Sequence, residues 1–232
     1  MENFLSTIID FIDKNYHQKN LNKTLLKLNL KIIFDIGAHK GEFSGHILKY
    51  FKSSKIYAFE PQSEIYFKLK KRFHQLKNVY SYNKALSDKN RKKKLNINIK
   101  TSTSTFSKYN KDSNWRKLKE FLLTGSNKSS FVKSEIVDVT SLDDFCKKKK
   151  INRIDLLKID TEGHEAEVLK GANRMLKKNI RYILLEFHFS KIYQNYNRIK
   201  IENILEKNNF KLVKKFKFPF LTFEDRIYKK II

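Results

Sequence analysis

Residues 32–41 read Ile-Ile-Phe-Asp-Ile-Gly-Ala-His-Lys-Gly, and this stretch decides the fold class. A run of β-branched and aromatic residues ends at an acidic residue and passes through two glycines into an amphipathic segment, residues 42–48. Glycine permits tight turns and a close approach of the backbone to a ligand. A strand, a glycine loop and a helix start in this order are typical of α/β proteins that bind nucleotide-like cofactors.

Strand and helix patterns alternate along the rest of the chain. Together they predict a doubly wound, mostly parallel sheet with helices on both faces. Residues 94–99 alternate like an exposed strand, one arm of a hairpin. The other expected strands are residues 55–61, 78–86, 135–139, 154–160, 182–188, 210–218 and 226–232. The expected helices are residues 63–76, 141–149 and 199–208, and one that follows residues 161–165.

Two segments stand apart from this alternation within a single expected domain, residues 1–232. Apolar residues recur at helical spacing near the start, so residues 1–28 are expected to form a helical segment that packs on the domain or forms a homodimer contact. Residues 101–134 contain a Ser/Thr-rich run and the tryptophan Trp115. We expect an insertion there, with a short helix near residues 115–123, that acts as a substrate lid.

The chain carries 50 basic and 24 acidic residues, a formal net charge of +26. Such a field attracts nucleic acid, anionic lipid or phosphorylated substrates. The lysines are scattered in short runs, however, which is typical of solvated faces, and the scarcity of glycine and proline indicates compositional bias. We therefore expect no specific nucleic acid partner, and an anionic substrate stays open as an alternative.

Cellular location is suggested only by general features of the chain. No apolar run reaches the roughly 18 to 20 residues of a membrane span, and the N-terminus lacks the basic start of a secretion signal. The single Cys146 excludes an internal disulfide and a multi-cysteine zinc site. These features predict a cytoplasmic protein without a membrane span.

Acidic residues around the glycine loop indicate which cofactor the fold binds. The loop reads Asp-x-Gly-x-x-x-Gly rather than the dinucleotide pattern, and Asp35 and Glu42 would repel a pyrophosphate. They suit S-adenosylmethionine, which carries an ammonium and a sulfonium. Asp35 would meet the ammonium directly or through water, while Gly37 and Gly41 let the backbone approach. Glu60, at the end of the second strand, would accept both ribose hydroxyls.

Alternative roles exist for the same residues. Asp35 could cap the helix that follows it, and Glu60 could be a turn residue before Pro61. An NAD-dependent oxidoreductase is disfavoured by Asp35 and by the missing third glycine. A nucleic-acid methyltransferase or binding module would draw on the charge, but residues 160–163 lack the Pro-Pro-Tyr type of tetrapeptide that base-methylating enzymes often carry.

The chain resembles the FkbM-type family of S-adenosylmethionine-dependent methyltransferases over residues 32–188. The similar blocks are residues 34–41, 59–61, 85–88, 141–143, 158–165 and 185–188. The resemblance implies a class I, Rossmann-like methyltransferase fold with a seven-stranded sheet. It also implies methyl transfer to a hydroxyl of a sugar, glycolipid, polysaccharide or natural product. The cofactor-binding residues expected within these blocks are Asp35, Gly37, Ala38, Gly41, Glu60, Pro61 and Ala85. His39 stands where the family more often has asparagine.

A sugar hydroxyl is a poor nucleophile and needs a base within hydrogen-bond reach. The ends of two expected strands offer six titratable side chains, Asp160, Glu162, His164, Glu165, Glu186 and His188. We favour Asp160 or His164 as the base and Glu186 as a group that orients the substrate or the base, with His188 a further candidate. Glu165 is expected to cap the following helix.

A divalent metal is an alternative to a protein base. Asp160, Glu186 and a histidine could hold Mg²⁺, which would polarise the acceptor hydroxyl. The spacing of these residues is not diagnostic of a metal site, so the mechanism without metal is favoured.

Overall fold

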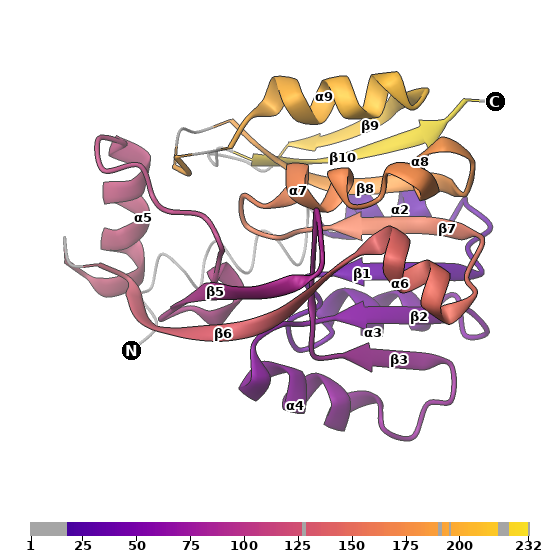
Figure 1. Ribbon diagram of the computed structural model, residues 1–232, viewed down its shortest axis with the longest axis horizontal. Helices are drawn as coiled ribbons and strands as arrows, with labels where there is room; N and C mark the ends of the chain where they lie inside the picture. The colour runs from indigo at the N-terminus through magenta and orange to yellow at the C-terminus, as the bar shows by residue number, and fades with distance from the viewer. Residues whose placement is uncertain (1–17, 127–128, 190–191, 195, 218–222, 232) are drawn as a thin grey trace.

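The computed structural model of the protein describes residues 18–126, 129–189, 192–194, 196–217 and 223–231. Its main element is a seven-stranded sheet in the order β3-β2-β1-β7-β8-β10-β9 (Figure 1). The strands are β1 (Ile32–Ile36), β2 (Lys55–Phe59), β3 (Val79–Tyr82), β7 (Ile154–Ile159), β8 (Ile180–His188), β9 (Phe210–Lys217) and β10 (Phe223–Lys230). All pairs are parallel except those of β10 with β8 and β9. The predicted mostly parallel sheet is confirmed.

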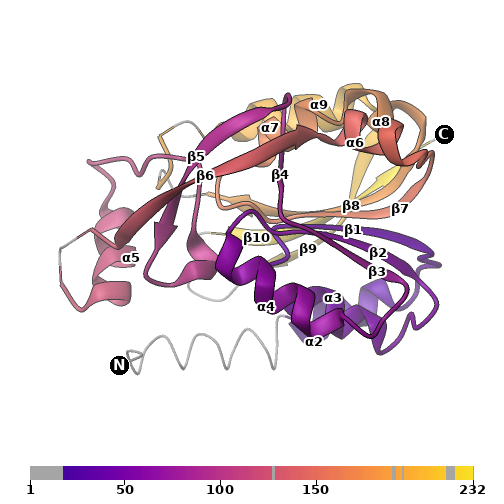
Figure 2. The same cartoon turned by 60° about the horizontal axis from the view of Figure 1, so that its bottom comes forward.

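Helices cover both faces of this sheet (Figure 2). One face carries α6 (Leu142–Lys149), α7 (Glu165–Lys170), α8 (Asn173–Lys178) and α9 (Arg198–Lys207), and the other carries α2 (Gln18–Leu25), α3 (Glu42–Leu48) and α4 (Ser63–Phe73). Successive strand residues point to opposite faces. Phe34 therefore packs edge-on against Phe145 of α6, with ring centroids 6.0 Å apart, whereas Ile33 joins the cluster that contains Leu25 of α2. Burial on both faces explains why these strands read as continuous apolar runs.

A second sheet of three strands departs from the expected pattern. It consists of β4 (Ala85–Ser87), β6 (Phe131–Ser141) and β5 (Arg91–Asn98), in the order β4-β6-β5. The single strand predicted over residues 78–86 is wrong, because the chain turns at Asn83. Its Nδ2 donates hydrogen bonds to the carbonyl oxygens of Glu60 at 3.0 Å and Pro61 at 2.9 Å. These bonds tie the turn to the end of β2 and send β4 into the second sheet.

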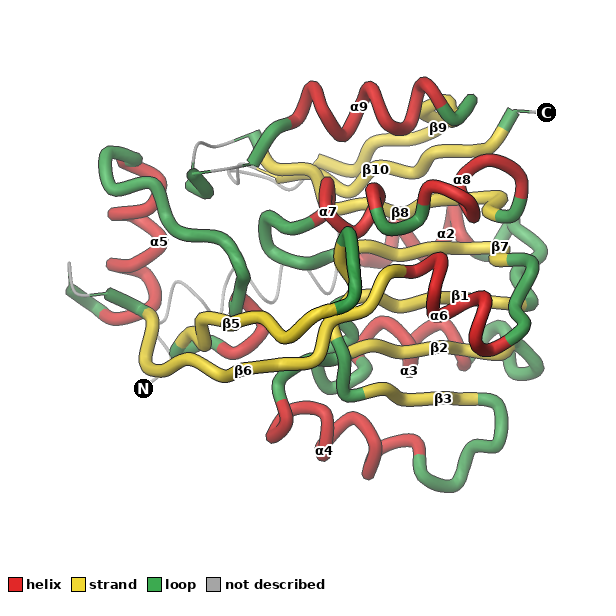
Figure 3. The backbone as a smooth tube through the Cα atoms, viewed as in Figure 1, coloured by secondary structure: helices red, strands yellow, loops and turns green. Residues whose placement is uncertain are grey.

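The segment between β5 and β6 contains the predicted insertion (Figure 3). Here β5 and β6 pair antiparallel out to Asn98 and Phe131, so the expected hairpin is confirmed but the predicted end of the insertion at residue 134 is wrong. The ladder of backbone hydrogen bonds begins the strand four residues earlier than predicted, at Phe131. Between them lie a short 3-10 helix, η2 (Thr101–Thr103), and α5 (Asn114–Thr124). The helix predicted over residues 115–123 is confirmed.

The start of α6, the N-terminal segment and the last edge strand complete the description of the fold. The Ser141 hydroxyl accepts a hydrogen bond from the Asp144 amide at 3.1 Å and so caps the start of α6. Of the helical segment predicted over residues 1–28, α2 is present, and residues 1–17 lie outside the described residues. Within the described ranges, none of the helices is long and apolar enough to cross a membrane. The edge strand β9, at the opposite side of the sheet from β3, carries lysines at 211, 214, 215 and 217.

Candidate active site

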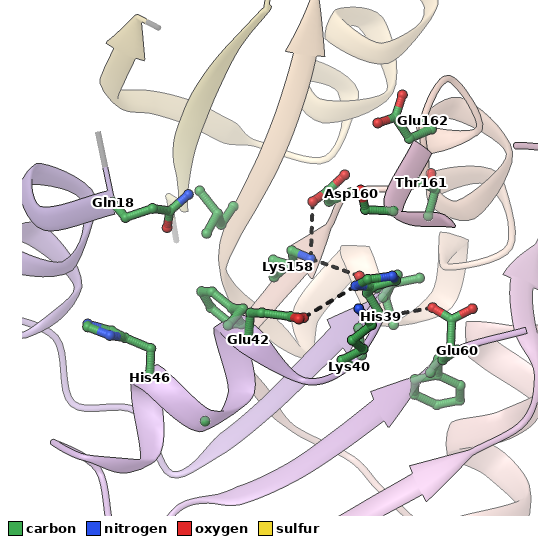
Figure 4. A pocket seen from close by; sticks show the side chains of 18 of the residues that line it. Gln18, His39, Lys40, Glu42, His46, Glu60, Lys158, Asp160, Thr161 and Glu162 are labelled. Atoms are coloured by element: carbon green, nitrogen blue, oxygen red, sulfur yellow. Dashed lines mark hydrogen bonds and ion pairs between the residues drawn. The ribbon is translucent and has the colours of Figure 1, made fainter. Parts of the chain in front are cut away.

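A cavity of about 1220 Å³ opens at the carboxyl ends of β1, β2 and β7 (Figure 4). In open α/β sheets this edge is where ligands bind. The cavity walls come from the glycine loop after β1, from α2 and from the start of the insertion. The sequence-predicted residues on this lining are Gly37, Ala38, Glu60, Pro61, Ala85 and Asp160.

The two glycines of the loop meet different needs. Gly37 has φ +79°, and a Cβ there would lie 1.9 Å from the Asp160 carbonyl oxygen. Only glycine therefore lets the ends of β1 and β7 approach this closely. Gly41 has φ +81°, and its Cβ would collide with the Phe73 ring of α4 at 2.4 Å. Gly37 lies on the cavity lining, and its approach to a ligand stays a prediction, while Gly41, which is outside the described lining, serves the packing of the loop on α4.

Glu60 presents a buried carboxylate at the end of β2. One oxygen accepts a hydrogen bond from the His39 amide at 3.0 Å, and the other accepts from the Gln62 amide at 2.8 Å. Burial raises the pKa of Glu60, while these hydrogen bonds and the His39 ring favour its ionised form. The apolar Pro61 and Ala85 line the same part of the cavity. An acidic acceptor beside an apolar wall fits the ribose and base of a nucleoside.

Asp35 is fully buried and is not among the described residues that line the cavity. Its Oδ2 accepts a hydrogen bond from the Ser44 hydroxyl of α3 at 2.7 Å, and its Oδ1 forms an ion pair with Lys158 Nζ at 3.1 Å. Lys158 also reaches the Asp160 Oδ2 at 3.3 Å. Burial alone would lower the pKa of Lys158, but the two carboxylates outweigh it and raise that pKa. Asp35 therefore faces a lysine rather than open space.

Sequence reasoning missed Lys158. A signal was present, because this lysine interrupts the otherwise apolar strand end Leu-Leu-Lys-Ile at residues 156–159. A charged residue inside a strand that is buried on both faces requires a partner. That partner, Asp35, lies directly opposite Lys158 in the register between β1 and β7.

Asp160 and Glu162 lie on the cavity lining just after β7. The Asp160 side chain is 40% exposed, and Figure 4 shows it directed toward the cavity. Restricted solvation and the charges of Glu162 and Asp225 raise the pKa of Asp160 despite the opposing effect of Lys158. Burial opposes the ionisation of Glu162, but Lys119 outweighs this effect and lowers its pKa. The site thus contains two neighbouring carboxylates with opposite pKa shifts.

Glu186 and His188 form a pair at the end of β8, outside the lining contributed by the described residues. Glu186 Oε2 lies 3.1 Å from His188 Nε2. Burial, followed by the charges of Asp160 and Glu162, raises the pKa of Glu186 well above its ordinary value. The pair therefore lies close enough to Asp160 and Glu162 for their charges to influence its protonation.

His164 does not join these groups. Its Nε2 lies 2.9 Å from the Ser87 hydroxyl, and its ring lies 4.9 Å from that of Phe106. Burial lowers the pKa of His164 to about 3. This position, away from the described lining of the cavity, does not favour the predicted role of His164 as a base. Glu165 accepts hydrogen bonds from the amides of Thr161 and Gly163 at 3.0 and 3.1 Å. Both amides precede α7, whose start carries no side-chain cap hydrogen bond, so Glu165 orders the loop before the helix instead of capping the helix as predicted.

The insertion contributes contacts that sequence reasoning did not predict. Thr101 Oγ1 lies 2.9 Å from His39 Nε2, and the Thr101 carbonyl accepts a hydrogen bond from Gln62 at 3.0 Å. From α5, Lys119 donates hydrogen bonds to Glu162 at 3.0 Å and to the Tyr193 hydroxyl at 3.2 Å. The partners lie 39 to 74 residues apart in sequence, so local patterns carry no signal for them.

The predicted alternative is a magnesium site formed by Asp160, Glu186 and a histidine. Among the described residues, no three His, Cys, Asp or Glu side chains are grouped so that they could hold a metal ion. The set of Asp160, Glu186 and a histidine therefore has no geometric support there.

The strand order, the antiparallel β10 and the cavity at the strand ends define a class I S-adenosylmethionine methyltransferase fold. Residues 35–212 match the methyltransferase FkbM domain, and the chain belongs to this family of methyltransferases. Over 197 residues it is 23% identical to 2-O-methyltransferase NoeI of Sinorhizobium fredii, an alignment that covers 83% of this chain and 77% of that protein.

Two solved structures support the fold. The crystal structure of methyltransferase FkbM from Methylobacillus flagellatus is similar with a TM-score of 0.54 and 14% identity, over 87% of this chain. This chain spans 43% of the length of that protein. A SAM-dependent methyltransferase from Aquifex aeolicus is similar with a TM-score of 0.51 and 13% identity, over 97% of this chain and 98% of the other.

Proposed function

We propose that the protein transfers a methyl group from S-adenosylmethionine to a hydroxyl of a saccharide, glycolipid or natural-product acceptor. The observation that carries this proposal is the cavity, whose lining contains two carboxylates. One is Glu60, placed to accept ribose hydroxyls, and the other is Asp160, whose pKa is raised. Membership of the FkbM family and the similarity to a 2-O-methyltransferase support oxygen as the acceptor atom.

The cofactor would lie along the glycine loop. Glu60 would accept the ribose hydroxyls, and Pro61, Ala85 and Ala38 would pack on the base and sugar. Gly37 lets the glycine loop lie close to the end of β7, so that the proposed cofactor site adjoins Asp160. When bound, the cofactor would supply an electrophilic methyl group: the acceptor oxygen would attack the methyl carbon in line with the C–S bond, and the sulfur would leave as the neutral thioether of S-adenosylhomocysteine.

Asp160 acts as the general base. Its carboxylate is accessible from the cavity, so an acceptor hydroxyl can donate a hydrogen bond to it and then transfer its proton. The raised pKa makes Asp160 a stronger base than an ordinary aspartate. Glu162 stays ionised beside Lys119, and its negative charge contributes to the raised pKa of Asp160. Glu186 and His188 form a neighbouring pair that is electrostatically coupled to these two carboxylates.

Equilibrium binding and methyl uptake together test this function. By isothermal titration calorimetry we expect the protein to bind S-adenosylmethionine and not NAD. Asp160→Asn should keep cofactor affinity within a few-fold but remove the transfer of labelled methyl to a panel of neutral and acidic oligosaccharides. Asp138→Asn, on the exposed β6 strand, is the matched control and should retain transfer. Absence of heat with S-adenosylmethionine, or full transfer by Asp160→Asn, would contradict the proposal.

The acceptor is proposed to be anionic. Basic side chains line the mouth of the cavity from several elements, namely Lys19, Lys23, Lys40, Lys49, Arg72, Lys84 and Lys100. Such a rim attracts an acidic saccharide and raises its local concentration at the site.

A further inference from the structure

A second hollow, of about 610 Å³, lies between α2 and the edge strand β9. We call it the lysine groove, because five exposed lysines line it, namely Lys23, Lys27, Lys214, Lys215 and Lys217. The part of this lining that the structure describes contains no acidic side chain. None of the ion pairs between described residues involves these lysines. Their ammonium groups are therefore available to an anionic ligand.

The two walls of the lysine groove are held in place by the core beneath them. Leu21 and Leu25 of α2 belong to the same buried cluster as Phe216 of β9. The lysines of the two elements are therefore kept on the sides of one groove before any ligand arrives. A hollow lined by charges of one sign raises the local concentration of ligands of the opposite sign.

The lysine groove adjoins the cavity of the candidate active site, because Lys23 lines both. Lys19, one helical turn before Lys23 on the surface of α2, lines the cavity. Lys27, just beyond the end of α2, lines the groove. A row of cations thus leads from the cavity into the groove. A ligand that occupies both at once must be a chain rather than a single sugar.

The uncharged part of the groove lining indicates what kind of chain fits. Asn20 and Thr24 of α2 contribute an amide and a hydroxyl, which can form hydrogen bonds with the hydroxyls of a sugar. Phe216 is only 7% exposed, so it offers no free face on which a nucleic acid base could stack. These features favour an acidic saccharide over a single-stranded nucleic acid.

We propose that the lysine groove is a distal subsite for an acidic polysaccharide, whose chain continues along α2 from the acceptor sugar in the cavity. The inference rests on the proposed function, because it takes the cavity as the place where the acceptor sugar binds. The groove lysines touch no reacting atom. They add affinity for the rest of the chain and thereby select polymeric acceptors over single acidic sugars.

Isothermal titration calorimetry with oligogalacturonates of two lengths tests this assignment. The wild-type protein should bind a dodecamer at least about 10-fold more tightly than a trimer, because the longer chain lies across both the cavity and the groove. Replacement of Lys27, Lys214 and Lys217 by glutamine should remove most of this preference. Replacement of Lys147, Lys148 and Lys149 by glutamine, which removes three exposed charges from the end of α6, should keep the wild-type ratio.

The same ratio of affinities in the wild type and the groove variant would overturn the inference. So would an equal effect of the groove variant on a polyuridylate of matched length or on vesicles that contain phosphatidylserine, because the groove would then respond to charge alone. S-adenosylmethionine is titrated separately. If it does not bind while the length preference still depends on the groove, the proposed methyl transfer fails and the groove remains a saccharide-binding site.

Discussion

At the scale of single residues, the site depends on how neighbouring carboxylates titrate. Asp160 shares the cavity with Glu162 and Asp225, and their charges add to restricted solvation in raising its pKa. A base acts only when ionised. A raised pKa therefore shifts the loss of base function on acidification to a higher pH than for an ordinary aspartate.

The pKa of Asp160 can be measured without knowing the acceptor. We expect carboxyl ¹³C chemical shifts, followed by NMR against pH, to place it above the ordinary 3.8. Asp225→Asn removes one like charge and should lower the value. Asp138→Asn, at the exposed side of the second sheet, should leave it unchanged. A wild-type value below 3.8, or equal shifts in both variants, would show that Asp160 is not tuned by its neighbours.

The sequence was sufficient to predict Glu60 at the cavity, because an acidic residue that ends a parallel strand must lie at the ligand-binding edge. It was not sufficient for Asp35. The same rule puts Asp35 at that edge, yet its carboxylate forms an ion pair with Lys158, which lies opposite it on β7. The difference is one of pairing between strands that are far apart in sequence, which periodicity along the chain does not report.

At the scale of elements, α5 is tied to the loop after β7 through one side chain. Lys119 bridges Glu162 and Tyr193, and both charged side chains of the ion pair are largely buried. Since Glu162 is two residues beyond Asp160, this contact links the insertion to the proposed base. The lid role of the insertion stays a prediction, and the Lys119–Glu162 ion pair is the contact through which it can be tested.

Loss of this anchor should destabilise the fold. Lys119→Met leaves the Glu162 carboxylate without its cation, so we expect unfolding in urea to require about 2–4 kcal/mol less free energy. Lys117→Met, on the exposed side of the same helix, should change stability by about 0.5 kcal/mol or less. Adding Glu162→Gln to Lys119→Met should restore part of the loss. Equal stabilities of the two single variants would refute the anchor.

Element boundaries show a similar limit of prediction. The helix α5 was predictable because its Ser113 cap and apolar spacing are local. The division of residues 78–86 into β3 and β4 was not, because it depends on hydrogen bonds from Asn83 to Glu60 and Pro61, 23 and 22 residues away. Local sequence still reads as continuous strand across that turn.

At the scale of the whole molecule, the net charge of +26 can act either as general solvation or as a field directed at the cavity. The basic rim of the cavity supports the second alternative. An oligogalacturonate, as an acidic probe, should then bind more tightly than a neutral malto-oligosaccharide of the same length. Its affinity should fall as salt rises from about 0.02 to 0.2 M, since screening shortens the reach of the field.

Two matched triple variants separate the alternatives. Replacement of Lys19, Lys23 and Lys40 by glutamine removes three charges from the cavity rim and should weaken oligogalacturonate binding about 10-fold or more. Replacement of Lys147, Lys148 and Lys149 by glutamine removes three charges from the end of α6 and should have much less effect. Equal losses would mean that the charge attracts anions without regard to the cavity.

The overall architecture was the most predictable level. Buried parallel strands are recognisable as apolar runs, and acidic or glycine residues at their ends mark the functional edge. The three-stranded sheet was missed, because β4 is three residues long and acquires its identity only by pairing with β6. Strand pairing is decided by the assembled fold rather than by the strand's own sequence.

The lysine-rich edge strand β9 has a consequence for how the protein behaves at high concentration. An exposed sheet edge is a template onto which another chain can add a strand, and the result is aggregation. The lysines at 211, 214, 215 and 217 place like charges along β9. A second copy approaching through its own β9 would bring these charges together at the spacing of adjacent strands, about 5 Å. The lysines of two β9 edges therefore repel each other, and any dimer is expected to form through another face.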